Sequence, residues 1–166
     1  MKTQHIIRVA VALAAVTSVA AAQIPKGRPT LITEVARPAG GPTRLSLRVQ
    51  LPPEVHVQSD RPREASLIPT ALTLAPPPGV TVIRVTYPAS SDLEQPGRAT
   101  PLAVFSGEFA ITVDVTVAGP GPVTIPGQLR YQACTDKVCF APAKAAVEWE
   151  VPAFAEATAG KPAFAR

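Results

Sequence analysis

Residues 109–117 read Phe109-Ala-Ile-Thr-Val-Asp-Val-Thr-Val117, and every second residue in this stretch is a large apolar one. Successive side chains of a β-strand point to opposite faces of a sheet, so this alternation predicts a strand with one face in a core and the other in water. The same period of two recurs at 45–50 and at 145–151. We therefore predict three half-buried strands in these places.

Weaker strand candidates lie between turn signals along the rest of the chain. The 166 residues include 20 prolines, about twice the usual share of ~5%. Proline breaks helix interiors and is confined to edges and turns in sheets, so long helices are not expected. About eight short strands in all predict an all-β chain that folds as an antiparallel β-sandwich. The weaker candidates are 31–36, 71–74, 80–87, 102–105 and 128–134.

The N-terminus has the pattern of a secretory signal. Lys2 and Arg8 precede an apolar run at 9–16, and Ala20-Ala-Ala22 supplies a cleavage site. The run is shorter than the ~20 residues that a membrane-spanning helix needs, which disfavours the alternative of an uncleaved anchor. We predict a signal peptide at 1–22, one domain at 23–151 and a disordered, Ala-rich tail at 152–166. The protein would then lie outside the cytoplasm, where disulfides persist.

Two cysteines, Cys134 and Cys139, are the only ones in the chain. A strand at 128–134, a turn at 135–138 and a return from Cys139 would let them face each other across a hairpin, near the ~3.8 Å between Cβ atoms that a disulfide needs. A disulfide that closes so small a loop contributes only about 2 kcal/mol by loop entropy. Both a structural disulfide and a redox-active pair therefore remain open.

The neighbours of the pair permit redox chemistry without requiring it. Lys137 would favour a thiolate and Asp136 would oppose it. Tyr131 and Phe140 flank the pair and offer an apolar wall for a docking partner, although ordinary core packing is the alternative for both. A metal site is disfavoured because zinc usually takes four ligands and the only histidine after the predicted signal is His56, for which we expect a structural role. The basic residues are scattered, which argues against a nucleic-acid partner.

Four upstream stretches occur with the cysteine stretch 131–142 in the order and at the spacing of a known family. They are Pro53-Glu-Val-His-Val-Gln-Ser-Asp60, Ile68-Pro-Thr70, Val85-Thr-Tyr-Pro88 and Val104-Phe-Ser-Gly-Glu-Phe109. The set, over about residues 45–151, resembles the N-terminal periplasmic domain of the DsbD thiol:disulfide interchange proteins. The resemblance implies an immunoglobulin-like fold without a cofactor, and a redox pair formed by Cys134 and Cys139. It also implies that Cys139 forms the mixed disulfide with a partner and that Cys134 resolves it.

The family resemblance further implies partners. The pair would receive electrons from a membrane electron transporter of DsbD type or a thioredoxin-like protein. It would pass them to periplasmic oxidoreductases such as a disulfide isomerase or a thioredoxin-like protein of cytochrome c maturation. No membrane domain or thioredoxin-like domain follows in this sequence, so we expect the donor to be a separate protein.

Two other departures from the family bear on the site. The gap between the cysteines is four residues, where some members have five. The family's shielding cap loop carries an aromatic residue, whereas the corresponding stretch here, 91–97, offers only Leu93. Whether the chain acts as an enzyme, as a protein-disulfide reductase component, stays open. The alternative is a non-catalytic secreted binding or scaffold module with a structural disulfide.

Overall fold

The computed structural model describes residues 27–153. The predicted signal peptide at 1–22 and residues 154–166 of the predicted tail lie outside the described residues. The described chain consists of strands joined by turns and loops, without a helix. Accordingly, residues 27–153 contain no helical segment of the length and hydropathy needed to cross a membrane.

The strands form three sheets, in each of which every neighbouring pair is antiparallel. The first sheet has the order β1 (Thr30–Ala36), β2 (Thr43–Gln50), β8 (Glu108–Val117), β5 (Val80–Thr86). The second has the order β11 (Ala143–Val151), β9 (Val123–Tyr131), β4 (Ala71–Leu74). The third has the order β10 (Ala133–Cys134), β3 (His56–Gln58), β7 (Leu102–Ser106), β6 (Ser91–Leu93).

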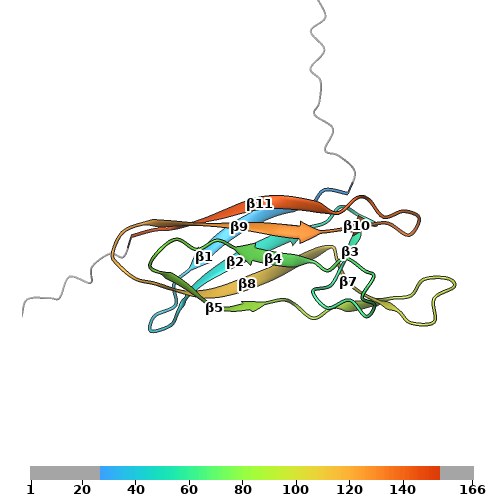
Figure 1. Ribbon diagram of the computed structural model, residues 1–166, viewed down its shortest axis with the longest axis horizontal. Helices are drawn as coiled ribbons and strands as arrows, with labels where there is room; N and C mark the ends of the chain where they lie inside the picture. The colour runs from blue at the N-terminus through green and yellow to red at the C-terminus, as the bar shows by residue number, and fades with distance from the viewer. Residues whose placement is uncertain (1–26, 154–166) are drawn as a thin grey trace, which may run out of the picture.

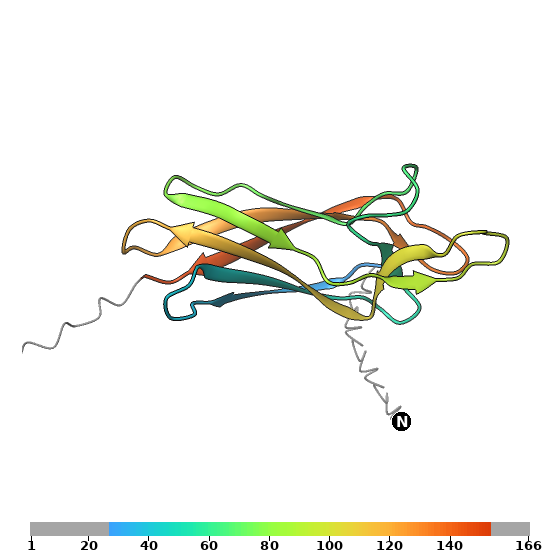
Figure 2. The same cartoon turned by 90° about the horizontal axis from the view of Figure 1, so that it is seen from below.

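The first two sheets are the layers of the sandwich, and the small third sheet lies at one end of it (Figure 1). This arrangement confirms the predicted immunoglobulin-like antiparallel β-sandwich. The described chain begins at the end that carries the third sheet, where Gly27 packs beside Phe140, and β11 ends at the opposite end (Figure 2).

The core follows the alternation seen in the sequence. Leu45 and Leu47 on β2 and Ile111 and Val113 on β8 are fully buried. The intervening residues of these two strands point away from the opposite sheet, which leaves most of them partly or fully exposed. Burial of such apolar faces is the main force that holds the two sheets together.

Trp149 on β11 ties the second sheet to the first. Its side chain is 1% exposed, and its Nε1–H donates a hydrogen bond to the Ser46 carbonyl oxygen of β2 over 2.9 Å. Gly127 on the neighbouring strand β9 leaves room for the indole, because a Cβ there would lie 3.0 Å from the ring. One residue thus supplies both a large apolar contact and a bond between the layers.

Most of the predicted strands are present, but one long strand has other bounds and two three-residue strands were missed. The expected strand at 128–134 is divided: β9 starts earlier, at Val123, and after Gln132 the chain moves into β10 of the third sheet. Pro126 and Gly127 interrupt the strand pattern in the middle of β9. The three-residue strands β3 and β6 are too short to display a period of two, so neither was expected.

The third sheet presents two different faces. Val57, Phe105 and Ala133 are in register across β3, β7 and β10 and belong to the hydrophobic core. His56 and Cys134 are paired across the same strands one position away, so their side chains lie on the other face. The outer face of this small sheet therefore carries Cys134, one of the two cysteines that the sequence singled out.

Candidate functional site: the disulfide hairpin

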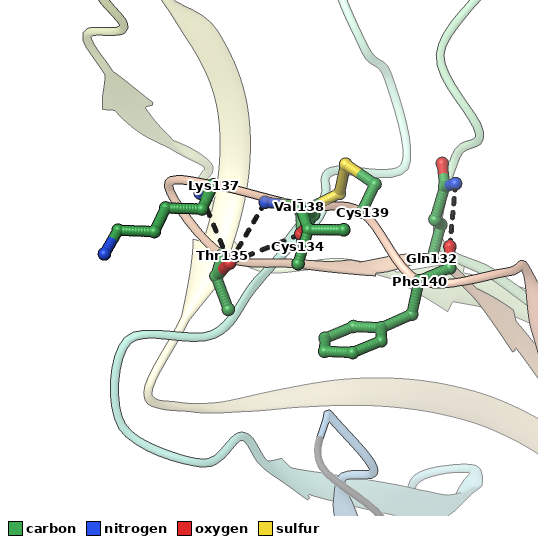
Figure 3. The surroundings of a disulfide bond; sticks show 7 residues. All are labelled: Gln132, Cys134, Thr135, Lys137, Val138, Cys139 and Phe140. Carbon is green, nitrogen blue, oxygen red and sulfur yellow. Dashed lines mark hydrogen bonds between the residues drawn. A yellow bond between two sulfur atoms is a disulfide. The ribbon is translucent and has the colours of Figure 1, made fainter.

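A disulfide joins Cys134 at the end of β10 to Cys139, as Figure 3 shows. The two residues form an antiparallel bridge with their Cα atoms 4.0 Å apart. The hairpin turns through the four residues between them, and the Thr135 amide donates to the Val138 carbonyl oxygen over 2.8 Å. The hairpin predicted from the sequence is therefore present, with its turn at 135–138.

Thr135 organises the turn, a role that the sequence analysis missed. Its Oγ1 accepts hydrogen bonds from the backbone amides of Lys137 at 3.3 Å and Val138 at 3.2 Å. A hydroxyl residue at the start of a tight loop commonly bonds the backbone that follows it, and that preference is a usable sequence signal. These short-range bonds hold the loop in one shape beside the sulfur atoms.

The segment that returns from the turn is hydrogen-bonded to the approaching segment beyond the disulfide. The Phe140 amide donates to the Ala133 carbonyl oxygen over 2.9 Å. The Gln132 side-chain amide donates to the Phe140 carbonyl oxygen over 3.0 Å. The hairpin is thus held by backbone and side-chain bonds on both sides of the two cysteines, and its shape does not depend on the sulfur–sulfur bond alone.

The two cysteines differ in their access to solvent. The Cys134 side chain is buried, with 2% exposure, whereas Cys139 is exposed. A disulfide is opened by a thiolate that approaches one of its sulfur atoms, so access decides which sulfur is attacked. Of the two residues, Cys139 is the more accessible from solvent.

The two aromatic residues support the hairpin from the core side. Tyr131 is 5% exposed and lies in the core, where burial raises its pKa. Phe140 is half-buried against the core, and its ring lies on the side of the loop away from the sulfur atoms (Figure 3). The φ of Gly27 is +89°, and a Cβ there would come within 2.8 Å of the Phe140 ring. Both aromatic positions match the core-packing alternative.

The polar loop residues Asp136 and Lys137 are both exposed. The Lys137 side chain extends away from the disulfide (Figure 3). Next to Cys139, the apolar side chain of Val138 is 53% exposed. The tip of the hairpin therefore offers a mixed polar and apolar surface beside the exposed Cys139.

Leu93, the only apolar residue of the expected cap loop, lies at the end of the edge strand β6 and is half-buried. It lines a hollow of about 450 Å³ together with Asp136 of the hairpin and His56 of β3. The two cysteines are absent from the lining of this hollow. Leu93 therefore lies near the hairpin loop, beside the outer face of the third sheet.

His56 is the neighbour of the pair that sequence reasoning did not find. It pairs directly with Cys134 in the ladder between β3 and β10. Burial lowers the pKa of His56, and the negative charge of Asp136 opposes that shift. The register between two short strands about eighty residues apart has no local signal in the sequence, which is why this contact was missed.

Among residues 27–153, His, Cys, Asp and Glu side chains form no cluster of three or more that could hold a metal ion.

Comparisons with known proteins place this hairpin in a family. Residues 22–150 match the sequence profile described as "Thiol:disulfide interchange protein DsbD, N-terminal". A search of curated protein sequences finds no match.

Among solved structures, the N-terminal periplasmic domain of ScsB from Proteus mirabilis is similar with a TM-score of 0.56 at 17% identity, over 80% of this chain and 51% of that chain. The protein thus spans about half the length of that ScsB chain. The DsbD N-terminal domain of Neisseria meningitidis in its reduced form aligns at 13% identity over 74% of this chain and 86% of that chain, with a TM-score of 0.48. The ScsB likeness concerns the fold alone. The profile match covers most of the chain and both cysteines, so the protein belongs to the family of DsbD N-terminal domains, whose chemistry is thiol–disulfide interchange.

Proposed function

We propose that this protein is a periplasmic carrier of reducing equivalents that works through the Cys134–Cys139 pair. Its donor is a separate membrane electron transporter of DsbD type or a thioredoxin-like protein. Its acceptors are periplasmic oxidoreductases, such as a disulfide isomerase or a thioredoxin-like protein of cytochrome c maturation. Family membership supports the reaction class. The signal pattern at 1–22 and the periplasmic origin of the similar ScsB domain support the compartment.

The observation that carries this proposal is the unequal exposure of the two cysteines. Cys139 is open to solvent at the hairpin tip, and Cys134 is buried behind it. An exchanging pair needs one sulfur that meets the partner and one that opens the mixed disulfide afterwards. We assign the first role to Cys139 and the second to Cys134.

Reduction of the pair proceeds by two thiolate attacks. A donor thiolate attacks Sγ of Cys139, the Cys134–Cys139 bond breaks, and Cys134 leaves as a thiolate. The second thiolate of the donor then attacks the donor sulfur of the mixed disulfide and releases Cys139. The donor dithiol becomes a disulfide, and the pair gains two electrons and two protons.

Delivery to an acceptor uses the same steps in reverse. The Cys139 thiolate attacks the acceptor disulfide and forms a mixed disulfide, and one acceptor sulfur leaves. Cys134 then attacks Sγ of Cys139, which releases the reduced acceptor. The direction of net flow follows the reduction potentials of the partners.

The surroundings of Cys139 supply the contact surface in this proposal. Asp136 and Lys137 give the hairpin tip polar contacts that set the orientation of a partner, and Leu93 borders the hollow beside them. Tyr131 and Phe140 support the hairpin from the core side. The pair carries the electrons itself, so no cofactor is needed.

Matched cysteine variants test the proposal. In Cys134→Ala, Cys139 keeps its access but loses its resolving partner, so mixed disulfides with thioredoxin-like partners should accumulate on non-reducing gels. Cys139→Ala is the control, and its buried Cys134 should trap little or nothing. If neither variant traps a purified thioredoxin-like protein or any protein of a periplasmic extract, the carrier proposal fails and the scaffold alternative gains.

A further inference from the structure

His56 and Cys134 are cross-strand partners at the outer face of the third sheet. Residues directly opposite each other in an antiparallel ladder point to the same face, with Cβ atoms about 4.5–5.5 Å apart. His56 is only 5% exposed, so its ring shares the buried environment of the Cys134 sulfur. The imidazole is therefore a near neighbour of the buried member of the pair.

The His56 ring has an unused hydrogen-bonding atom. Its Nε2 is buried and has no hydrogen-bond partner among the described residues. Buried polar atoms are nearly always bonded, so an unbonded one calls for a reason. Because burial holds its pKa below 6.5, the ring is neutral near pH 7, and a neutral imidazole has one nitrogen that can accept a proton.

Cys134 needs a proton acceptor at one step of the exchange. To resolve the mixed disulfide it must attack as a thiolate, because the thiol is a poor nucleophile. Apolar burial disfavours the thiolate, and Cys134 has almost no contact with water that could take its proton. A base must therefore come from the protein.

We propose that His56 accepts the Sγ proton of Cys134 when Cys134 resolves the mixed disulfide, an inference that rests on the proposed function. As the proton moves to the imidazole, the sulfur electron pair forms the Cys134–Cys139 bond. The bond between Cys139 and the acceptor breaks, and the acceptor sulfur leaves as a thiolate. The imidazolium then loses its proton to water. In the reducing direction the imidazolium protonates Cys134 as it leaves.

The charges that face His56 suit this role. Its hollow is lined by three acidic residues, Glu54 before β3, Asp92 on β6 and Asp136 in the hairpin. The adjacent strand β7 contributes only uncharged residues to this lining. Asp92 is partly neutralised by Arg63, with 2.5 Å between carboxylate and guanidinium. The remaining negative charge favours the transient imidazolium.

The test follows each thiol of the reduced protein separately. Dithiobis(nitrobenzoate) reacts first with Cys139 and releases one coloured thiolate, and Cys134 then closes the disulfide and releases a second. The second release is intramolecular, so its rate does not depend on reagent concentration. His56→Gln should slow this second release by about 100-fold at pH 7, the low end of what a positioned base contributes. The first release should change less than about twofold.

Gln58→Leu is the matched control. Gln58 lies two residues along β3 on the same face and is also buried, and its Oε1 likewise has no hydrogen-bond partner within residues 27–153. A general disturbance of this face would slow both variants, whereas loss of a base slows only His56→Gln. Slowing of the second release in His56→Gln by less than about tenfold, or equal slowing in both variants, overturns the inference.

The pH profile gives a second readout that does not depend on a variant folding. In the wild type, the second release should level off above the pKa of His56 measured by NMR in the reduced protein. A rate that instead rises about tenfold per pH unit through neutrality, with no inflection at that pKa, overturns the inference. If the Cys134→Ala variant traps no partner through Cys139, the proposed function fails. The proton-transfer measurement uses no partner protein, so its result is independent of that failure.

Discussion

The interior between the two large sheets and the part of the third sheet's outer face that holds His56, Gln58 and Cys134 are both buried, but they are built differently. Between the large sheets the buried side chains are almost all apolar, and the Trp149 indole N–H is hydrogen-bonded. On the outer face of the third sheet, His56, which pairs with Cys134, and Gln58 each bury a polar atom that has no hydrogen-bond partner within residues 27–153.

The apolar interior stabilises the folded state, whereas the unbonded polar atoms on the third sheet lower its stability. Each unsatisfied buried polar atom costs about 1–3 kcal/mol, which an apolar residue of the same shape would avoid. Unbonded polar groups beside a disulfide with an exposed cysteine are consistent with a surface that serves a chemical function at a cost in stability.

The largest effect is expected in the core. Trp149→Ala removes a fully buried indole and its bond to Ser46, and should lower the free energy of unfolding by about 3–5 kcal/mol. Urea denaturation followed by circular dichroism measures this. Trp149→Phe, which keeps an aromatic ring, should lose clearly less. A loss below about 1 kcal/mol for the alanine variant would show that the interior does not depend on this contact.

A smaller effect is expected when the disulfide is reduced. The closed loop is short, so the reduced protein should lose only about 2 kcal/mol of unfolding free energy relative to the oxidised one. Denaturation of both redox forms under identical buffer conditions tests this. A loss as large as that of Trp149→Ala would mean that the hairpin behaves as part of the structural core, which favours the scaffold alternative.

Two regions should make stability depend on pH: the third sheet, through His56, below pH 6.5, and the first sheet, through Asp114, below pH 3.8. Folded His56 has a pKa below 6.5, so as pH falls from 6.5 towards that lower value the unfolded chain binds more protons and stability declines. The Arg44 guanidinium holds the pKa of Asp114 below 3.8. The stability from Asp114 is present above pH 3.8 and is lost as pH falls through the lowered pKa.

Denaturation midpoints between pH 7 and pH 3 measure these two declines. His56→Gln should flatten the profile in the upper range and leave the lower range unchanged. A wild-type protein equally stable at every pH from 7 down to 4.5 would contradict the buried, neutral state of His56.

The smallest effect concerns the charge of Asp136. Its carboxylate raises the pKa of His56, so Asp136→Asn should lower that pKa further. NMR titration of the His56 ring protons measures the shift. Asp92→Asn is the control, because Asp92 lines the same hollow but is paired with Arg63, and it should shift the pKa less. A larger shift in the control would mean that Asp136 is not the nearer charge.

Much of the fold was predictable because it is encoded locally. The alternation at 45–50, 109–117 and 145–151 identified β2, β8 and β11, and two cysteines separated by four residues indicated the hairpin. Each pattern reports which side of a strand faces the core, and that follows from the order of neighbouring residues.

The rest depends on contacts between distant segments. His56 lies beside Cys134 only because β3 and β10 pair in one register, and three-residue strands carry no pattern that fixes a register. The burial of Cys134 and the exposure of Cys139 likewise follow from how the third sheet joins the sandwich. Sequence therefore indicated the cysteine pair but not His56 beside it.

The reduction potential of the Cys134–Cys139 pair tests the central claim most directly. The oxidised protein is equilibrated in thiol–disulfide buffers of defined potential, and the reduced fraction is counted by alkylation and mass spectrometry. An exchanging pair predicts a value above about −300 mV, within reach of thioredoxin-like partners. A value clearly below about −300 mV would mark a structural disulfide and contradict the account.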